Sequence, residues 1–378
     1  MENKLNKTPI IADKTLIFTT LMLVIFGIFM IYSASNYNAL QHYNDSFFYV
    51  KKQTLSFVVG IIFIVATSFL SLDALKKISL PLYIISVLLL ALVFAPIIGV
   101  ENYGAKRWLN LGITTIQPSE IAKFAMVFLL AKVLDTCDVT KFKGFLFSIL
   151  TVGVVCGLII IEPNMSITVC VAMVAFVMLI VGGARKKYLI CLIIPVLIAL
   201  PILIIAEPYR IKRMMAFVNP WLSPQAEGYQ LIQSYYALGS GGLFGVGYLN
   251  SRQKFLFLPF SESDFIFSVI GEELGLFGCI FTLLLFLIII WRGISIAIKC
   301  QSRFGCYCAV GIVAIIAIQT MLNIAVVSGS IPPTGLPLPF ISAGGSSLVV
   351  FMASVGILEK IAKLNYINSH NILSNHNI

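Results

Sequence analysis

The chain has 378 residues, of which 59% are hydrophobic and only 11% are charged, and its mean hydropathy is +0.98. A soluble domain carries about 25% charged residues, so this composition excludes an ordinary soluble protein and indicates a polytopic membrane protein whose charges are confined to loops. The net charge of +10 does not indicate nucleic-acid binding, because lysine and arginine lie between apolar runs and form no single basic stripe.

Ten apolar runs are each long enough to cross a membrane as a helix. We therefore expect an all-α membrane domain over residues 15–365, with polar tails over 1–14 and 366–378. The amino-terminal run is too long for a signal peptide, so we expect no cleavable signal. The expected spans are 15–34, 54–71, 80–99, 118–134, 144–161, 165–182, 188–206, 264–290, 306–327 and 346–362.

The connections between these spans differ in length and composition. We expect a polar aromatic loop over 35–52, a short turn over 73–77 and an amphipathic loop over 101–120. The one long connection, 207–263, is rich in proline, glycine and tyrosine, and loops of this length are usually functional or disordered. Its arginines, tryptophan and glycines favour an ordered loop with a function.

The distribution of positive charge predicts the orientation of the chain. Alternate short connections and the tails hold sixteen lysines and arginines on one side, against four in the opposite short loops. Cytoplasmic loops carry the excess of positive charge, so we expect both termini in the cytoplasm. The long loop 207–263 and a closing Pro/Gly hairpin over 328–347 are then extracytoplasmic.

The strongest catalytic candidate is Asp264, in the segment FLFLPFSESDFIFSVIGEELGLFG over 255–278. Acids in a lipid-buried helix are costly, and they usually face a partner or a wet cavity and mark function. Asp264 lies where the expected helix leaves the membrane on the outer side, so we predict that it is a catalytic base. Glu272 follows two turns later, offset by about 80°, and can face the same cavity, whereas Glu273 is expected to point the opposite way.

Two pairs of charged residues are candidates for substrate binding. Lys106 and Arg107 can hold a phosphate, arginine by bidentate contact and lysine as a point charge, or they can anchor the protein at lipid headgroups. Glu120 and Lys123 are three residues apart and share a helix face. They form either a structural ion pair or part of a cavity lining.

Glycine-rich segments offer weaker candidates. Ser342, Gly344, Gly345 and Ser346 precede a helix, where backbone N–H groups can bind an anion or where the glycines simply form a turn and cap. The glycines over 239–247 lack the lysine of a phosphate-binding loop. No His or Cys spacing indicates a metal site, and His42, alone in a loop, is assigned no role. These residues leave a transporter and a lipid-handling enzyme equally open.

Motifs spread over nearly the whole chain resemble one family. They read YSAS over 32–35, GAKRWLNLG followed by QPSEIAKF, FVNPW, GYQLIQSYYALGSGGLFGVG, NSRQKF, SDFIFSVIGEELG and NIAVVSGSIPPTGLPLPFISAGGSSL. In this order they resemble the SEDS proteins (shape, elongation, division and sporulation), which include FtsW, RodA and SpoVE. The hairpin and NSRQKF are more similar to the FtsW/SpoVE branch than to RodA.

The resemblance implies ten spans and polymerisation of lipid II into glycan strands, with release of undecaprenyl pyrophosphate, for septal or spore cell-wall synthesis. It implies Asp264 as the catalytic aspartate, a bacterial plasma-membrane location at a septum, and a class B penicillin-binding protein with other divisome or sporulation proteins as partners. A divalent cation, Mg or Mn, is expected on the pyrophosphate, and no organic cofactor. A lipid II flippase and a non-catalytic scaffold for the penicillin-binding protein are the alternatives.

Two motifs depart from the family pattern. The lead-in that usually reads LPE-x-H-T-D is LPFSESD here, over 258–264. The motif that usually reads QPD followed by a small residue and glycine is EPNMS here, over 162–166. The aspartate itself, Asp264, is retained.

Overall fold

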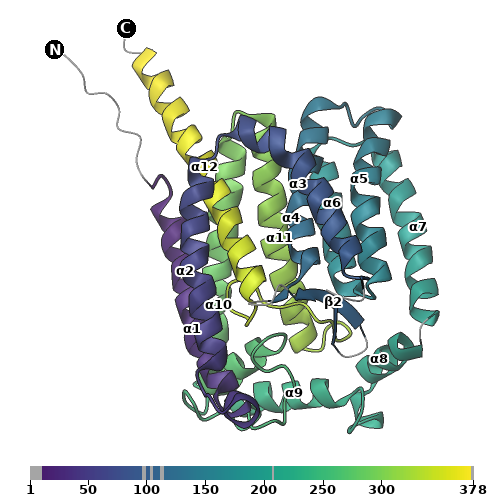
Figure 1. Ribbon diagram of the computed structural model, residues 1–378, viewed down its shortest axis with the longest axis vertical. Coiled ribbons are helices and arrows are strands. Elements are labelled where there is room, and N and C mark those ends of the chain that lie inside the picture. The colour runs from purple at the N-terminus through teal and green to yellow at the C-terminus, as the bar shows by residue number, and fades with distance from the viewer. Residues whose placement is uncertain (1–10, 96–98, 103–104, 111–114, 207, 376–378) are drawn as a thin grey trace, which may run out of the picture.

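The structure is a computed structural model, and it describes residues 11–95, 99–102, 105–110, 115–206 and 208–375. Within these residues the fold is a bundle of long helices, with two shorter helices and a small sheet at one end (Figure 1). The long helices are α1 (Lys14–Tyr43), α2 (Phe48–Phe69), α3 (Leu72–Leu92), α4 (Pro118–Thr136), α5 (Phe142–Ile161), α6 (Met165–Val181), α7 (Lys186–Ile205), α10 (Ile266–Lys299), α11 (Arg303–Val327) and α12 (Gly345–Asn375).

A helix occurs at each of the ten expected positions, and the all-α polytopic fold class is confirmed. Among the described residues, α1, α2, α3, α5, α10 and α11 are long and apolar enough to cross a membrane by length and composition. That all ten cross it stays a prediction. The two ends of the described chain lie together at one end of the bundle, and the segment between α7 and α10 lies at the other (Figure 1).

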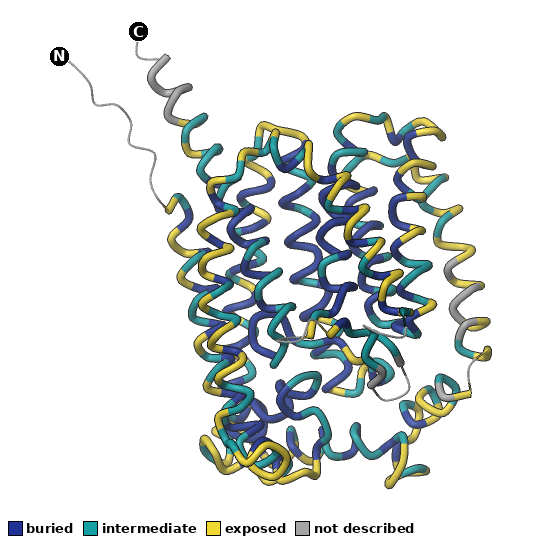
Figure 2. Tube along the Cα trace, in the orientation of Figure 1, coloured by how far each residue is buried: buried dark blue, intermediate teal, exposed yellow. Residues whose placement is uncertain are grey.

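The centre of the bundle is formed by α4 and α11, which are buried over most of their length (Figure 2). The surrounding helices expose large apolar side chains such as Phe69 and Ile298, at 70% and 79%. A helix that is apolar on its outer face is typical of contact with lipid. α7 lies at the periphery and has most of its described residues exposed.

Two expected connections are wrong. The loop over 35–52 is largely helix, because α1 continues to Tyr43 with Ser35 and Ala39 buried one turn apart. Asn44 then ends it in the left-handed conformation (φ 51°), and its N–H donates to the Leu40 carbonyl. The turn over 73–77 is also helix: α3 begins at Leu72, eight residues before the expected span, because the Ser71 side chain caps it.

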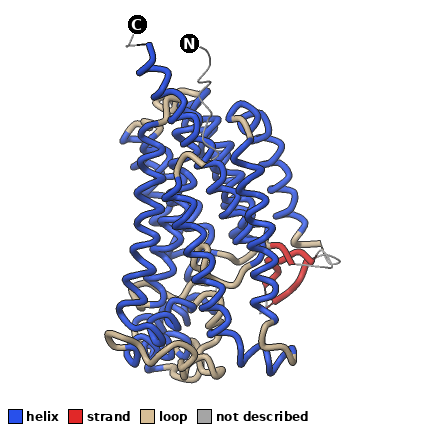
Figure 3. The backbone as a smooth tube through the Cα atoms, turned by 90° about the vertical axis from the view of Figure 1, so that its left-hand side faces the viewer, coloured by secondary structure: helices blue, strands red, loops and turns tan. Residues whose placement is uncertain are grey.

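The segment expected as an amphipathic loop contains a small antiparallel sheet, seen beside the bundle in Figure 3. Strand β2 (Ala105–Asn110) pairs with β1 (Gly99–Asn102) on one side and with β3 (Thr115–Ile116) on the other. Sequence patterning missed these strands because each is short. Strand β2 carries Lys106 and Arg107, the residues predicted to hold a phosphate.

The long connection between α7 and α10 is ordered by its own helices, α8 (Pro208–Val218), the 3₁₀ helix η1 (Pro220–Leu222) and α9 (Tyr229–Gly241). It is hydrogen-bonded to α10 near a break in that helix. Gly275 has φ 64° and ψ −160°, and the freed carbonyls of Glu272 and Glu273 accept the N–H groups of Val246 and Gly247 at 2.9 and 3.0 Å. A Cβ at Gly275 would lie 2.4 Å from the Gly245 nitrogen, so the break requires glycine.

Candidate functional site

Asp264 ends a tight turn that leads into α10. The N–H groups of Ser263 and Phe265 both donate to the Phe260 carbonyl, at 3.1 and 3.2 Å, and Phe260 has a positive φ of 58°. Asn323 on α11 donates its side-chain N–H to the Asp264 carbonyl at 2.8 Å. The backbone of Asp264 is therefore held in place, and the residue as a whole has intermediate exposure.

The Pro/Gly hairpin between α11 and α12 packs directly against this turn. Asn323 also donates to the Leu336 carbonyl at 2.7 Å, and Ser342 donates to the Ser263 carbonyl at 2.6 Å. A Cβ at Gly335 would lie 3.2 Å from Asp264 Oδ2, so the carboxylate lies against bare backbone. Among the described residues, no group donates a hydrogen bond to that carboxylate, so packing rather than donors positions it.

The electrostatic surroundings of Asp264 suit a base. Burial, assisted by the Glu262 carboxylate, raises the pKa of Asp264 to about 7, against the opposing effect of Arg213 and Arg107. A general base is most effective when its pKa lies near the operating pH. At neutral pH a large fraction of this carboxyl is both ionised and basic enough to remove a proton.

Two arginines supply positive charge around Asp264. Arg107 on β2 donates to the carbonyls of Pro163 and Glu162, at 2.7 and 3.3 Å. Burial raises the pKa of Glu162 to about 8, so this neighbouring acid is mostly uncharged at neutral pH and leaves the charge of Arg107 largely uncancelled. Arg213 on α8 donates to the Pro333 carbonyl of the hairpin at 3.3 Å.

Lys106 and Arg107 were predicted to hold a phosphate or to anchor the protein at lipid headgroups. They are neighbours on strand β2, and successive side chains of a strand point to opposite faces. Of the two, Arg107 lowers the pKa of Asp264. Phosphate binding by Lys106 stays a prediction.

Glu120 and Lys123 form a buried ion pair, with 2.8 Å between Oε1 and Nζ. Lys123 also donates to Gln319 Oε1 at 2.5 Å, and Ser347 donates to Glu120 Oε2 at 2.7 Å. Gln319 in turn donates to the Pro337 carbonyl of the hairpin at 2.8 Å. The pair is therefore part of a closed network that joins α4, α11 and α12, and its contact with substrate stays a prediction.

The residues before α12 connect helices to the Asp264 turn. The Ala343 N–H donates to the Glu262 carbonyl at 2.9 Å, the Gly344 N–H donates to Gln53 Oε1 at 3.2 Å, and Ser346 accepts from the Gln117 N–H at 3.5 Å. Two of the N–H groups near the helix start are thus used within the protein. Anion binding by Ser342, Gly344, Gly345 and Ser346 stays a prediction.

Glu272 and Glu273 lie in a different cluster, and the expectation that they face opposite ways is wrong. Both receive the segment that follows Gly247: the Arg252 N–H donates to Glu272 at 2.9 Å and the Ser251 N–H to Glu273 at 3.2 Å. The segment reaches both acids because it folds over α10 at the Gly275 break. The contacts of Glu272 in the structure are with this segment and not with Asp264.

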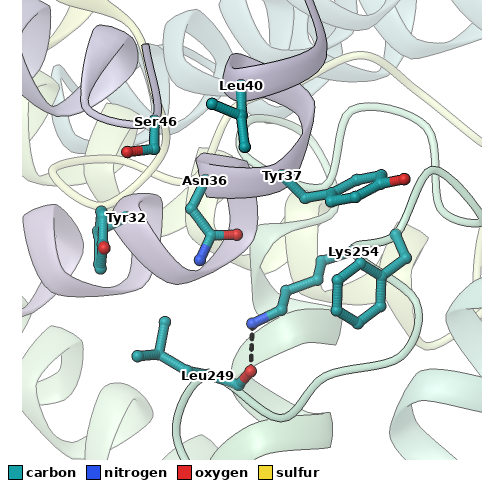
Figure 4. A pocket seen from close by; sticks show the side chains of 8 residues that line it. Tyr32, Asn36, Tyr37, Leu40, Ser46, Leu249 and Lys254 are labelled. Atoms are coloured by element: carbon teal, nitrogen blue, oxygen red, sulfur yellow. Dashed lines mark hydrogen bonds between the residues drawn. The ribbon is translucent and has the colours of Figure 1, made fainter. Parts of the chain in front are cut away.

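A pocket of about 240 Å³ lies beside this second cluster. Figure 4 shows Lys254 pointing into it and donating to the Leu249 carbonyl at 2.6 Å. Because Lys254 is also paired with Glu273 at 3.3 Å, its charge is already compensated. The pocket is lined by Tyr32, Asn36, Tyr37, Leu40, Ser46, Leu249, Lys254 and Phe255.

Three residues around Asp264 were missed as site residues. Arg213 was noted only as loop composition, although α8 carries Arg210, Lys212 and Arg213 among apolar residues, which was a usable signal. Asn323 is an amide inside an apolar span, which also marks function. Glu262 was noted only as part of the lead-in, although it lies two residues before the predicted base.

This fold and site define a polytopic α-helical membrane protein in which an aspartate lies within electrostatic reach of two arginines. The chain belongs to the FtsW/RodA/SpoVE family of cell cycle proteins, whose sequence model matches residues 14–367. It is 40% identical over 357 residues to Stage V sporulation protein E of Bacillus subtilis (strain 168), covering 93% of this chain and 97% of that protein. It is 36% identical over 354 residues to "Probable peptidoglycan glycosyltransferase FtsW" of Geobacter sp. (strain M18), covering 93% and 96%.

Two solved structures share the fold. One is the rod shape determining protein RodA of Thermus thermophilus, with a TM-score of 0.70, 26% identity and coverage of 94% of this chain and 97% of that one. The other comes from work on the structural coordination of polymerization and crosslinking by a peptidoglycan synthase complex. Its TM-score is 0.78, at 27% identity and 94% and 98% coverage. The resemblance found in the sequence is confirmed.

Proposed function

We propose that the protein is a peptidoglycan glycosyltransferase that joins lipid II disaccharide units into glycan strands and releases undecaprenyl pyrophosphate. The observation that carries this proposal is that one carboxyl of pKa about 7, Asp264, lies within electrostatic reach of Arg107 and Arg213. The names of the related proteins support the same reaction class.

The chemistry of the reaction matches this division of roles. An α-linked donor that gives a β-linked product reacts with inversion, so one base is sufficient and the leaving group needs positive charge rather than a protonating acid. Hydrolysing glycosidases differ, since they use two carboxylates. Asp264 removes the proton of the acceptor 4-hydroxyl. At the same time the oxygen of that hydroxyl forms a bond to the anomeric carbon of the donor. The bond from that carbon to the pyrophosphate breaks, and its electron pair leaves with the pyrophosphate.

The arginines stabilise the charge that develops on the departing pyrophosphate. Arginine suits this role because its planar donors match phosphate oxygens, and fixed charges aimed at a developing anion are a large catalytic term. A divalent cation on the pyrophosphate would add Lewis-acid charge stabilisation. No cluster of three or more His, Cys, Asp or Glu side chains able to hold a metal ion occurs in the described part of the chain, so the substrate phosphates would supply most of its ligands.

The same proposal includes location and partner. Both termini would be cytoplasmic and Asp264 extracytoplasmic, at a division or sporulation septum. The positive charges of the short loops support this, as do the two described ends at one end of the bundle, opposite α8 and α9. A class B penicillin-binding protein would be the partner, supported by the related structure from a peptidoglycan synthase complex.

The decisive experiment is polymerisation of labelled lipid II by the purified protein, with and without the candidate partner. We expect a ladder of glycan strands from the unaltered protein and none from Asp264→Asn. Movement of lipid II across liposomes that persists in Asp264→Asn, without any ladder, would favour a flippase instead. Growth supported by Asp264→Asn would favour a scaffold.

A further inference from the structure

We propose that Glu262 is a second proton-carrying group of this site, which tunes the basicity of Asp264 and passes its proton toward His42 and the solvent. The inference rests on the proposed function and assigns roles to two residues that the reaction scheme above does not use. Each turnover leaves a proton on Asp264, and the carboxyl must lose it before the next acceptor arrives. Its carboxylate lies against the hairpin at Gly335, so a neighbouring group that takes the proton shortens the cycle.

Glu262 is placed to receive that proton. It lies two residues before Asp264 in the same turn and is only 7% exposed. Its carbonyl accepts from the Ala343 N–H at 2.9 Å. Its carboxylate accepts from the Ser261 hydroxyl at 3.3 Å and from the Asn38 side chain. This nearly buried residue has hydrogen bonds at its backbone carbonyl and at its carboxylate. The orientation of the carboxyl is therefore fixed.

One face of α1 continues from Glu262 to the solvent. Ala34, Asn38 and His42 are four residues apart and therefore share a helix face. The Ala34 carbonyl accepts from Ser261 at 3.2 Å, Asn38 contacts the Glu262 carboxylate, and His42 lies within electrostatic reach of it. His42 is exposed, so this face leads from the carboxyl pair to the solvent.

The geometry of His42 suits a terminal proton acceptor. Its Nδ1 lies 3.1 Å from the Asn38 carbonyl, and a carbonyl only accepts, so Nδ1 carries the hydrogen in the neutral ring. Nε2 is then the basic nitrogen. The proton passes from Asp264 to the Glu262 carboxylate, then to His42 Nε2 or a water, and then to bulk solvent, and each donor returns to its starting form.

The surrounding charges make the first transfer feasible. Burial raises the pKa of Glu262, and its hydrogen bonds with Ser261 and Asn38 oppose this shift. Asp264 faces Glu262, Arg213 and Arg107. Because both carboxyls are displaced in the same direction, the proton affinities of the two groups are brought closer together than they would be if only Asp264 were shifted.

Two substitutions at Glu262 separate the two roles. Glu262→Gln removes both the negative charge and the ability to carry a proton, whereas Glu262→His, the residue usual at this place in the family, removes only the charge. We expect both variants to shift the acidic limb of the kcat/KM profile to lower pH, because the charge that raises the pKa of Asp264 is gone. Only Glu262→Gln should lose several-fold in plateau rate and regain it with added imidazole or formate.

His42→Ala should also lose plateau rate and regain it with imidazole, and it tests the pathway if Glu262→Gln fails to fold. Glu227→Gln, in the same loop but paired with Lys212, is the matched control and should keep the unaltered profile. A Glu262→Gln profile that matches the unaltered protein would overturn the proposal. So would an equal loss at every pH without rescue, which indicates a structural role. No strands from the unaltered protein at any pH would instead count against the proposed function.

Discussion

Two pairs of acids, Glu262 with Asp264 and Glu272 with Glu273, lie eight to eleven residues apart, the first pair just before α10 and the second within its first turns, and their surroundings differ. Glu272 and Glu273 are buried and accept hydrogen bonds from backbone and side-chain donors, and Lys254 pairs with Glu273. The Asp264 carboxylate receives no hydrogen bond among the described residues, and Glu262 accepts from the Ser261 hydroxyl and the Asn38 side chain but has no cation paired with it in the described part of the chain. Buried carboxylates that are paired and hydrogen-bonded have a structural role, because removing one partner of such a pair is strongly destabilising. Carboxyls left short of donors have raised pKa values and can do proton chemistry.

The largest expected effect comes from removing the acid that lacks donors. Asp264→Asn should lower polymerisation by about 10² to 10⁴-fold, the usual range for loss of a general base, as measured by strand formation from lipid II. An undiminished strand ladder would remove Asp264 from the role of base.

The same variant should gain stability at high pH. The pKa of Asp264 in the folded protein, about 7, lies above its unfolded value of about 3.9. Its contribution to stability is therefore complete below about pH 4 and lost as pH rises through 7. Asp264→Asn should melt above the unaltered protein at pH 8 and show no such gain at pH 4.

Breaking the buried ion pair between Lys254 and Glu273 should instead lower the stability of the protein. Lys254→Met leaves Glu273 buried without its cation, which costs about 3 to 5 kcal/mol, and it should lower the melting temperature in detergent. Lys212→Met is the control, since its partner Glu227 is solvent-accessible and such pairs contribute about 1 kcal/mol or less. Equal losses in the two variants would contradict the comparison.

The cations around Asp264 should affect substrate use and not folding. Arg107→Ala should lower kcat/KM by about 10 to 100-fold, the loss of one charged contact of about 1.5 to 3 kcal/mol. Lys106→Ala, on the opposite face of β2, should have a smaller effect. An equal loss of kcat/KM in the two variants, measured by titration with lipid II, would show that Lys106 and Arg107 do not have different roles.

The pH profile of the unaltered protein should report the ionisation of Asp264. Below pH 7 the rate should fall about tenfold per pH unit, because the base must be ionised, and it should level above pH 7. A profile that is flat from pH 5 to 8 would show that the group of pKa about 7 does not limit the reaction.

The smallest effect is expected at the hairpin. Gly335→Ala places a methyl group 3.2 Å from Asp264 Oδ2 and should displace the carboxylate by a few tenths of an ångström. Misplacement of about 1 Å can cost about 10²-fold, so we expect a loss of a few-fold in kcat with little change in melting temperature. Gly153→Ala, in open space, is the control.

The class of fold could be predicted from the sequence, because ten long apolar runs separated by charged loops are compatible with few folds other than a bundle of membrane-spanning helices. The sequence also located Asp264, since an acid at the edge of an apolar run is rare. It could not reveal the Gly275 break, because a glycine in a helix and a glycine that ends one look the same in a pattern. It also did not show that the segment after Gly247 lies over α10, where Ser251 and Arg252 reach the carboxylates of Glu272 and Glu273.

Long-range contacts were also beyond sequence patterns. Asn323 meets Asp264 across 59 residues, and Ser342 meets Ser263 across 79. Such pairs depend on how the helices pack, which propensity does not encode. The opposite faces of Lys106 and Arg107 depend on β2, which is too short to show an alternating pattern.

The break at Gly275 has a consequence for how the family can vary in length. The chain is tied to α10 at Val246 and Gly247 and returns to the same helix at Asp264. The intervening residues therefore form a tether of fixed span between two points on one rigid element. A deletion within 248–263 would pull the base out of register, whereas insertions near 223–228, before the tether begins, would leave it undisturbed. Natural variation in loop length should accordingly collect on one side of Gly247 and be rare on the other.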